Sequence, residues 1–487
     1  MTQSTRAPRI PKMWPAWAAA LLAGCAAGPQ FHRPAVAAPA HYRTAGGSRQ
    51  AAPPTLLARG PYRQYIALGE SYSGPWWALF RSVRLDALIR RALADNHDIA
   101  AAEAAVAEAR EQVRAGAADR LPQVMSDLAS GRQKYGAEFL GPNAFAPFSF
   151  AAAGVSISYR LDYIGATARS IEQRRAMVRY RQSELQAARL TLTAEVARQA
   201  VVIAAARAQI AAVNELLAED RDNLGLVRRA LAAGSVPRLD VLTAQAQLAG
   251  DETRLPPLYQ RLARARHALA VLLGRPPASW HEPDPTLSEL ILPRRIPVSV
   301  PSQLLRHRPD ILAAQAELHA ATAAVGVATA NLYPHIDLTG SLGQQALRAS
   351  QLFDPGSTAW SLIAGITEPL FDGGRLRAER RAALDTLNAS AAAYQQVVVA
   401  AFGQVADALD ALHHDAQLCA AQARAQTLSR GRLALERESY LAGNTGLLPV
   451  LDAERQREHA ALGLLAAEER QYLDTIGLLL AVGGGLS

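Results

Sequence analysis

The sequence predicts an α+β protein built mainly from very long α-helices, with two internal repeats and two short β-hairpins. The first observation is Ala166–Leu224, a long run without Gly or Pro that is rich in strong helix formers. The second observation is that a run of the same kind begins at Arg375. The third is a change, just before each run, to alternating apolar and polar residues, which is typical of β-strands. Each repeat is therefore expected to contain a hairpin followed by a long helix.

The first long helix is expected to extend to Ala232, where the turn signal Ala233-Gly234 begins. It would then contain 67 residues and measure about 100 Å at ~1.5 Å per residue. Such a helix is too polar to cross a bilayer as a single span. The second long helix is expected at residues 375–442, interrupted only by Gly403 and Gly431.

The segments flanking the two long helices match at fixed offsets in the numbering. Asn96-His97-Asp98 corresponds to Arg308-Pro309-Asp310 at an offset of 212. Val241-Leu242-Thr243-Ala244 corresponds to Val450-Leu451-Asp452-Ala453 at an offset of 209. The offset falls only between residues 135 and 151, so the copies differ there by the length of a loop. These matches indicate an internal duplication.

The duplication predicts how the chain is divided. The expected segments are a signal peptide at 1–24, an extended arm at 25–84, a first repeat at 85–274 with its hairpin at about 124–163, a linker at 275–301, a second repeat at 302–480 with its hairpin at about 335–370, and a tail at 481–487.

Shorter helices and the strands complete each repeat. One helix is expected at 85–115, and a second at 236–273 that Pro256-Pro257 should bend or break. Residues 154–162 alternate strictly between apolar and polar side chains, which indicates a strand with one apolar and one wet face. The expected strands are 124–135 and 154–162 in the first repeat, and 335–342 and 360–367 in the second.

The N-terminus has the features of a secretory leader. Arg6, Arg9 and Lys12 precede the apolar segment Met13–Ala20. The following Leu22-Ala23-Gly24-Cys25 resembles the lipobox of bacterial lipoproteins, in which the Cys becomes the acylated N-terminus. The alternative is an ordinary signal peptide with a chance Cys.

Several classes of function are not expected. Cys419 is the only cysteine besides Cys25 and is interpreted as a small core residue. Because Cys25 belongs to the lipobox, no intrachain disulfide is expected. No nucleophile elbow, phosphate-binding loop or metal-spaced Cys/His set is present, so neither an enzyme nor a cofactor or metal site is expected. The net charge of +8 is not gathered into a dense basic run, which argues against nucleic-acid binding.

The hairpins raise a problem of open edges. Strands of about ten residues with this alternation resemble those of a membrane β-barrel. Four strands cannot enclose a lumen, and a bilayer does not tolerate unpaired strand edges. Either the hairpins lie on a soluble core, or several chains pool their strands.

Motifs along nearly the whole chain from Cys25 resemble TolC-like outer-membrane efflux factors, in the lipoprotein branch typified by OprM and NodT. The motifs are Leu22-Ala23-Gly24-Cys25 with Gly28-Pro29-Gln30-Phe31-His32-Arg33-Pro34, then Trp76-Trp77-Ala78-Leu79-Phe80, Leu304–Ile311, Asn331-Leu332-Tyr333-Pro334, Pro369–Arg375 and Val450–Arg455.

The resemblance implies a homotrimer in the outer membrane, anchored by a lipid on Cys25 and extending into the periplasm. Each protomer would give four strands to a transmembrane β-barrel, and the helices would form a periplasmic α-helical barrel. It also implies a passive exit duct of a tripartite efflux system, working with a periplasmic adaptor (membrane fusion protein) and an inner-membrane pump of the RND type. The alternative is a lipid-anchored periplasmic coiled-coil scaffold without a pore.

The resemblance further implies a closed periplasmic end at the two helix turns, 233–240 and 442–448. The candidate gate residues are Asp240, Tyr440, Leu448, Asp452 and Arg455. The alternative is that the two Asp residues merely face solvent or cap helices. The sequence departs from the family at Thr445-Gly446, where a polar or acidic residue is common, and at Arg160, near which an acidic residue is common.

Overall fold

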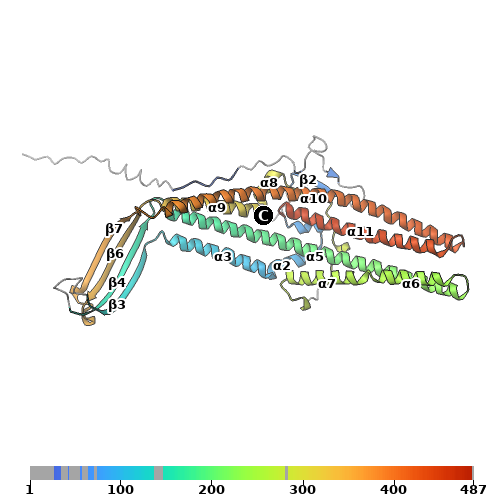
Figure 1. Cartoon of the computed structure of the whole chain (residues 1–487), viewed down its shortest axis with the longest axis horizontal. Coiled ribbons are helices and arrows are strands. Elements are labelled where there is room, and N and C mark those ends of the chain that lie inside the picture. Colours follow the sequence, from blue (N-terminus) through green and yellow to red (C-terminus); the bar gives the residue numbers. More distant parts are fainter. Residues whose placement is uncertain are drawn as a thin grey trace, which may run out of the picture. The chain divides into compact units, whose positions relative to one another are not determined.

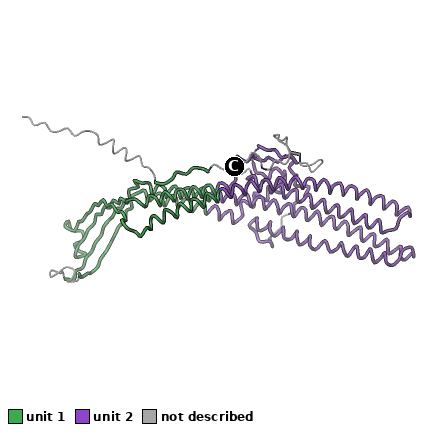
Figure 2. Tube along the Cα trace, turned by 45° about the horizontal axis from the view of Figure 1, so that its top comes forward, with its two compact units in different colours: residues 1–35, 105–181, 313–394 green, residues 36–104, 182–312, 395–487 purple. Residues whose placement is uncertain are grey.

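The chain folds into long α-helices and two β-sheets in the computed structural model (Figure 1). The structure describes residues 27–34, 42, 55–56, 64–70, 74–135, 146–279 and 283–484. The predicted signal peptide and Cys25 lie outside the described residues. Two compact units are present: unit 1 comprises 1–35, 105–181 and 313–394, and unit 2 comprises 36–104, 182–312 and 395–487 (Figure 2). Each unit therefore contains segments of both repeats.

The two long helices match their predictions closely. Helix α5 spans Ala166–Ala232 and helix α10 spans Arg375–Leu441, 67 residues each, so the second is one residue shorter than predicted. Both end at a glycine with φ 75°, Gly234 and Gly443, a left-handed conformation that costs glycine little. A single offset in the numbering thus relates both the helices and the turns that end them.

One expectation about α5 is wrong. An 18-residue window within α5 is as apolar as a membrane span, although the sequence predicts a helix too polar to be one. Helix α9 (Pro309–Ala330) contains a similar window. Most of the α5 window is buried inside the protein, with Val196, Ala200 and Ile203 fully enclosed, as expected of a core helix.

The prediction of a single helix at 85–115 is also wrong, because two helices occupy this segment. Helix α2 spans Val83–Asp95 and α3 spans His97–Ala118. Asn96 between them has an extended backbone, and its Oδ1 accepts hydrogen bonds from the backbone N–H of Asp98 (2.9 Å) and Ile99 (3.2 Å). Asn96 therefore acts as an N-cap that starts a new helix. Helix α3 and its counterpart α9 share both bounds at an offset of 212.

The return helices differ between the repeats. In the first repeat, α6 (Arg238–Glu252) and α7 (Leu255–Leu272) are separated just before Pro256-Pro257, as predicted, since proline is tolerated in the first turn of a helix but not in its interior. In the second repeat, α11 (Leu447–Ala481) runs for 35 residues without a break.

Unit 1 contains an antiparallel four-stranded sheet in the order β3-β4-β6-β7. The strands are β3 (Gln123–Gln133), β4 (Phe148–Leu161), β6 (His335–Ala346) and β7 (Thr358–Thr367), so β4 begins six residues before the predicted segment. The register places Arg160 opposite Asp337 and Tyr159 opposite Leu338.

The register gives this sheet one apolar and one largely polar face, because directly opposed residues point to the same side. The apolar face carries exposed Val124, Leu128, Val155, Ile157, Leu338, Leu342, Trp360, Leu362 and Ile366. The other face carries Asp127, Ser156, Arg160, Asp337, Ser341 and Ser361. The predicted alternation is therefore confirmed.

Unit 2 contains a second, smaller sheet and the tryptophan pair. Its strands β1 (Thr55–Leu56), β2 (Tyr65–Leu68) and β5 (Arg295–Val298) lie in that order. Trp76 is 1% exposed and donates a hydrogen bond to Thr193 on α5 (3.2 Å), which fixes the short helix η1 (Trp76–Phe80) against the long one. The remaining short helices of unit 2 are η3 (Pro277–Ser279), η4 (Leu287–Glu289) and α8 (Pro301–His307), whereas η5 (Ala349–Gln351) and η6 (Pro355–Ser357) belong to unit 1.

Candidate functional site

Both turns that reverse the long helices lie in unit 2, at the same end of the four helices α5, α6, α10 and α11 (Figure 1). Beneath the first turn, Leu224, Val227, Val241 and Ala244 form a small apolar cluster, and Leu447 from the second hairpin packs against it. This contact joins the α5–α6 hairpin to the α10–α11 hairpin.

Asp452 on α11 is the centre of a polar group just after the second turn. Its Oδ1 accepts a hydrogen bond from Arg455 Nη2 (3.1 Å), and its Oδ2 accepts from Arg432 Nη2 (3.0 Å) and Gln456 Nε2 (3.1 Å). The side chains of Asp452 and Arg455 are 39% and 54% exposed. Ion pairs at such wet positions contribute only about 0–1 kcal/mol each, so they fix geometry more than they add stability. The structure therefore brings together the predicted Asp452 and Arg455.

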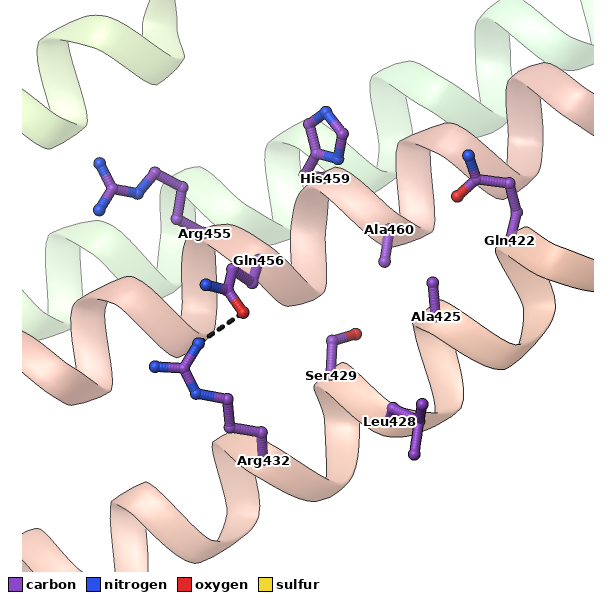
Figure 3. A pocket seen from close by; sticks show the side chains of 9 residues that line it. All are labelled: Gln422, Ala425, Leu428, Ser429, Arg432, Arg455, Gln456, His459 and Ala460. Atoms are coloured by element: carbon purple, nitrogen blue, oxygen red, sulfur yellow. Dashed lines mark hydrogen bonds between the residues drawn. The ribbon is translucent and has the colours of Figure 1, made fainter.

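Arg432 and Gln456 were not predicted for this site. Arg432 precedes the turn and reaches Asp452 from α10, the antiparallel partner helix. The sequence could have predicted the position of Arg432. Residues at equal distances from Asn444, the centre of the turn, face each other across a helical hairpin. Arg432 and Gln456 are equally distant from Asn444, and they are hydrogen bonded (Figure 3).

The other three candidate residues stand apart from this group. Tyr440 packs, partly buried, against the cluster of Leu433, Val450 and Ala453 that lies beneath the second turn. Leu448 is 58% exposed. Asp240 lies in the first turn of α6, where a carboxylate is favoured by the helix dipole. Among the described residues, no hydrogen bond or ion pair joins the Asp240 side chain to Asp452 or Arg455, so both the gate and the solvent-facing interpretation stay open for Asp240.

A groove between α10 and α11 runs beside the Asp452 group. It has a volume of about 640 Å³. Its lining residues are Gln422, Ala425, Leu428, Ser429, Arg432, Arg455, Gln456, His459 and Ala460 (Figure 3). Within the described part of the chain, no set of three or more His, Cys, Asp or Glu side chains is arranged to hold a metal ion.

A second group of polar side chains lies on the largely polar face of the four-stranded sheet. Arg160 on β4 donates to Asp337 on β6 (2.9 Å), and Ser341 and Ser361 are hydrogen bonded across β6 and β7 (2.8 Å). The arginine that departs from the family pattern therefore faces a carboxylate from the neighbouring strand.

Comparisons with known proteins agree over most of the chain. A family model described as "Outer membrane efflux protein" matches residues 88–275 and 300–484. The chain is 32% identical over 451 residues to the pyoverdine export outer membrane protein OpmQ of Pseudomonas aeruginosa, covering 90% of this chain and 94% of OpmQ. It is 29% identical over 470 residues to the outer membrane protein OprJ of the same organism, covering 95% and 94%. The solved structure of the outer-membrane channel OprN superposes with a TM-score of 0.84 at 28% identity, covering 94% of this chain and 99% of OprN.

Proposed function

Since the chain belongs to the outer membrane efflux protein family, we propose that it works as a homotrimeric duct whose periplasmic end is held shut by the ion pairs of Asp452. The chain is an outer-membrane channel that extends into the periplasm and forms the exit duct of a tripartite efflux system. The alternative of a scaffold without a pore is disfavoured, because the relatives are channels. The family consists of channels rather than enzymes, and we propose no catalysis.

The observation that supports a trimeric assembly is the four-stranded sheet with its exposed apolar face. Within the described residues, β3 and β7 each pair on one side only, which leaves two open edges. In a bilayer each unsatisfied backbone group costs several kcal/mol, at ~2–7 kcal/mol by transfer data. If β7 of one protomer pairs with β3 of the next, three copies close a single transmembrane barrel with four strands from each. The apolar face then contacts lipid and the polar face lines the lumen.

We propose further that Cys25 carries a covalent lipid and that no other cofactor is bound. A lipid and a barrel would give the protein two membrane attachments. The proposed partners are a periplasmic adaptor and an inner-membrane pump of the RND type, which would supply the energy for export. OpmQ is named for pyoverdine export, so an exported small molecule is one class of cargo that the duct could carry.

The proposed gate follows from threefold symmetry. In a trimer, Asp240 and Asp452 each become a ring of three carboxylates, and like charges near an axis repel one another. Arg455 and Arg432 neutralise Asp452 within each protomer. Tyr440 and Leu448 would line the same closed end. Because each exposed pair is weak, at about 0–1 kcal/mol, an adaptor could open the ring by contacting only a few of them.

Leak conductance in planar bilayers tests this proposal. Asp452→Ala and Arg455→Ala should leave folding intact and raise the leak, and Asp240→Ala with Asp452→Ala should be leakier than either single change. High salt should act in the same direction more weakly, because it screens exposed charges. Glu438→Ala, an exposed carboxylate on α10, is the matched control. If the Asp452 and Arg455 variants conduct no more than this control, the gate lies elsewhere.

A further inference from the structure

A second group of charged residues lies in unit 2 where the α10–α11 hairpin packs against the helices α5–α7, and unlike the Asp452 group it is buried. Asp220 is 4% exposed, and Asp251, Glu454 and Glu458 are each 3% exposed. We call these residues and the charged side chains around them the buried carboxylate cluster. Its members are Glu219 and Asp220 on α5, Asp251 on α6, Arg254 between α6 and α7, Arg437 on α10, and Glu454, Arg457 and Glu458 on α11.

The contacts within the cluster cross between the two hairpins. Arg254 donates to Glu458 across them (3.0 Å) and also pairs with Asp251 on its own side (3.2 Å). Arg457 on α11 donates to Glu219 on α5 (2.6 Å). In addition, Asn223 on α5 donates to Glu454 on α11 (2.6 Å), and Arg437 donates to the other oxygen of Glu454 (2.8 Å). The hairpins are therefore joined by polar contacts as well as by the apolar contact of Leu447.

The charges in the cluster do not balance. It holds five carboxylates and only three guanidinium groups, so full ionisation would leave two uncompensated negative charges. Two buried carboxylate oxygens, Asp220 Oδ2 and Glu458 Oε2, have no hydrogen-bond partner among the described residues. A buried ionised oxygen without a donor is costly, and binding a proton removes that cost.

The environment of both groups favours the proton-bound form. Burial, together with the negative charges of Asp251, Glu454 and Glu458, raises the pKa of Asp220 to about 7. Burial is the main cause that raises the pKa of Glu458 to about 7, against the opposing effect of Arg254. Both groups would then gain and lose protons near neutral pH, while the remaining carboxylates stay paired with arginine or asparagine.

We propose that the buried carboxylate cluster is a proton-binding site, centred on Asp220 and Glu458, that holds the two hairpins together and sets how firmly the duct stays closed. The proposal rests on the gate at the helix turns, because it assigns the closed state to the arrangement in which the hairpins are apposed. It concerns residues other than those of the gate.

The direction of the pH effect follows from linkage. When the hairpins are apposed, Asp220 and Glu458 are buried; when the hairpins separate, water reaches these groups and their pKa falls toward ~4, the ordinary value of a carboxyl group. Between about pH 4 and 7 the apposed state therefore binds more protons than the separated state. Lowering the pH in this window strengthens the apposed state, and raising the pH through 7 weakens it.

Thiol labelling measures separation of the hairpins without relying on conductance. Leu447→Cys places a thiol where the second hairpin contacts the first, and Ser235→Cys places one at the exposed first turn as a reference. Labelling of each site is read by mass spectrometry of its peptide. The labelling rate at position 447 is divided by the rate at position 235. This ratio corrects for the larger fraction of reactive thiolate at higher pH.

We expect this ratio to rise between pH 6 and pH 8 by about tenfold for each of the two groups, Asp220 and Glu458, that loses its proton when the hairpins separate. The rise should disappear in the Asp220→Asn, Glu458→Gln protein and persist in Glu252→Gln, a neighbouring exposed carboxylate that pairs with Arg221. A flat ratio in the parent, or an unchanged rise in the double variant, would overturn the proposal.

A second measurement avoids the Leu447 substitution. Infrared titration of the protein with Leu447 intact should show a protonated carboxyl band that is lost with a midpoint near pH 7 and is diminished in Asp220→Asn. Asp415, a buried carboxyl group of α10 outside the cluster, also has a pKa raised to about 7 by burial, so the part of the band that Asp220→Asn removes is the part that reports the cluster. A band that Asp220→Asn leaves unchanged would show that no proton is held at Asp220. A pH-dependent labelling ratio with no leak in Asp452→Ala would reject the gate while keeping the proton site, so the two failures are distinguishable.

Discussion

Arg432 on α10 and Asp452 on α11 form an ion pair, with 3.0 Å between Nη2 and Oδ2, across the helical hairpin that turns at residues 442–446. Arg455 approaches the other oxygen of the same carboxylate from one turn further along α11. Asp452 therefore lies between two guanidinium groups from two helices. Either arginine can partly neutralise the carboxylate when the other is removed.

This arrangement predicts that Arg432 contributes to closure as Arg455 does. Arg432→Ala should raise leak conductance to a similar extent as Arg455→Ala, and the double change should exceed the sum of both, because only the double variant leaves Asp452 without a cation. Arg430→Ala is the control, since Arg430 is exposed on the same helix and makes no ion pair within the described residues. Equal conductance of the Arg432 and Arg430 variants would exclude a role for Arg432.

The parts of the fold that sequence reasoning predicted well depend on local patterns. The bounds of α5 followed from a run of helix formers without Gly or Pro up to Leu224, extended to the turn signal at Ala233-Gly234. The choice of Asp452 and Arg455 came from the resemblance to the efflux family, and the structure pairs them at a spacing of three residues on one helix. The helix bounds depend on neighbours in the sequence, so one sequence suffices to find them, whereas the gate residues needed the resemblance.

The features that sequence reasoning missed depend on contacts between distant segments. Asn96 breaks a helix although the residues around it are good helix formers, because its side chain caps the next segment. Arg432 is recognised only when the two arms of a hairpin are aligned about their turn. Asp220 in the first repeat meets Glu454 and Glu458 in the second, and no local pattern marks it as buried. Predicting these contacts requires the register of helix packing.

The lipid on Cys25 gives a direct biochemical prediction. Protein labelled with palmitate in cells should lose the label in Cys25→Ser, and its retention in the outer membrane should weaken, because the barrel alone would then hold it. Cys419→Ser serves as the control, since Cys419 is fully buried. Full labelling of the Cys25→Ser protein would reject the lipobox interpretation.

Within unit 1, the segment after Cys25 packs against α9 through two glycines, Gly28 and Gly326, that lie very close together. Gly28 has φ 82°, and a Cβ added there would lie 2.5 Å from Gly326 Cα on α9. Arg169 on α5 donates to the carbonyl oxygen of Ala27 (3.0 Å) and is itself buried. A larger residue at position 28 would have to push the backbones apart.

Gly28→Ala should therefore release residues 27–34, at a cost of about 1–3 kcal/mol from backbone strain and overlap. Hydrogen exchange of this segment should become faster in the variant. Gly403→Ala is the informative contrast: Gly403 lies exposed on α10, with open space where a Cβ would stand. Replacing it should raise stability by about 0.5–1 kcal/mol, because alanine favours helix interiors. Unchanged exchange in Gly28→Ala would show that the close contact is not needed for docking.

The last prediction concerns Asp415 on α10, a buried carboxyl group outside the buried carboxylate cluster. It is 5% exposed, its Oδ2 has no hydrogen-bond partner among the described residues, and Arg470 Nε lies 3.7 Å from its Oδ1. Burial, and then the neighbouring carboxyl of Asp474, raise the pKa of Asp415 to about 7. In the unfolded chain an aspartate has a pKa of ~3.9. The folded protein therefore binds more protons between these two values, and stability from this group falls as the pH rises through the window.

Asp415→Asn removes the charge that must be buried at high pH. At pH 8 the free energy of unfolding should increase by about 1–2 kcal/mol, less than the full linkage value because the amide that replaces the carboxyl is itself a polar group buried without a full set of hydrogen bonds. At pH 5, where the folded parent is largely protonated, the increase should be smaller than at pH 8 by about half or more. Thermal unfolding in detergent at both pH values measures this difference, with Asp407→Asn, an exposed aspartate of α10, as the control. An equal stabilisation at pH 5 and pH 8 would mean that Asp415 is ionised in the folded protein at both, since only a group that keeps its proton at pH 5 makes the effect depend on pH.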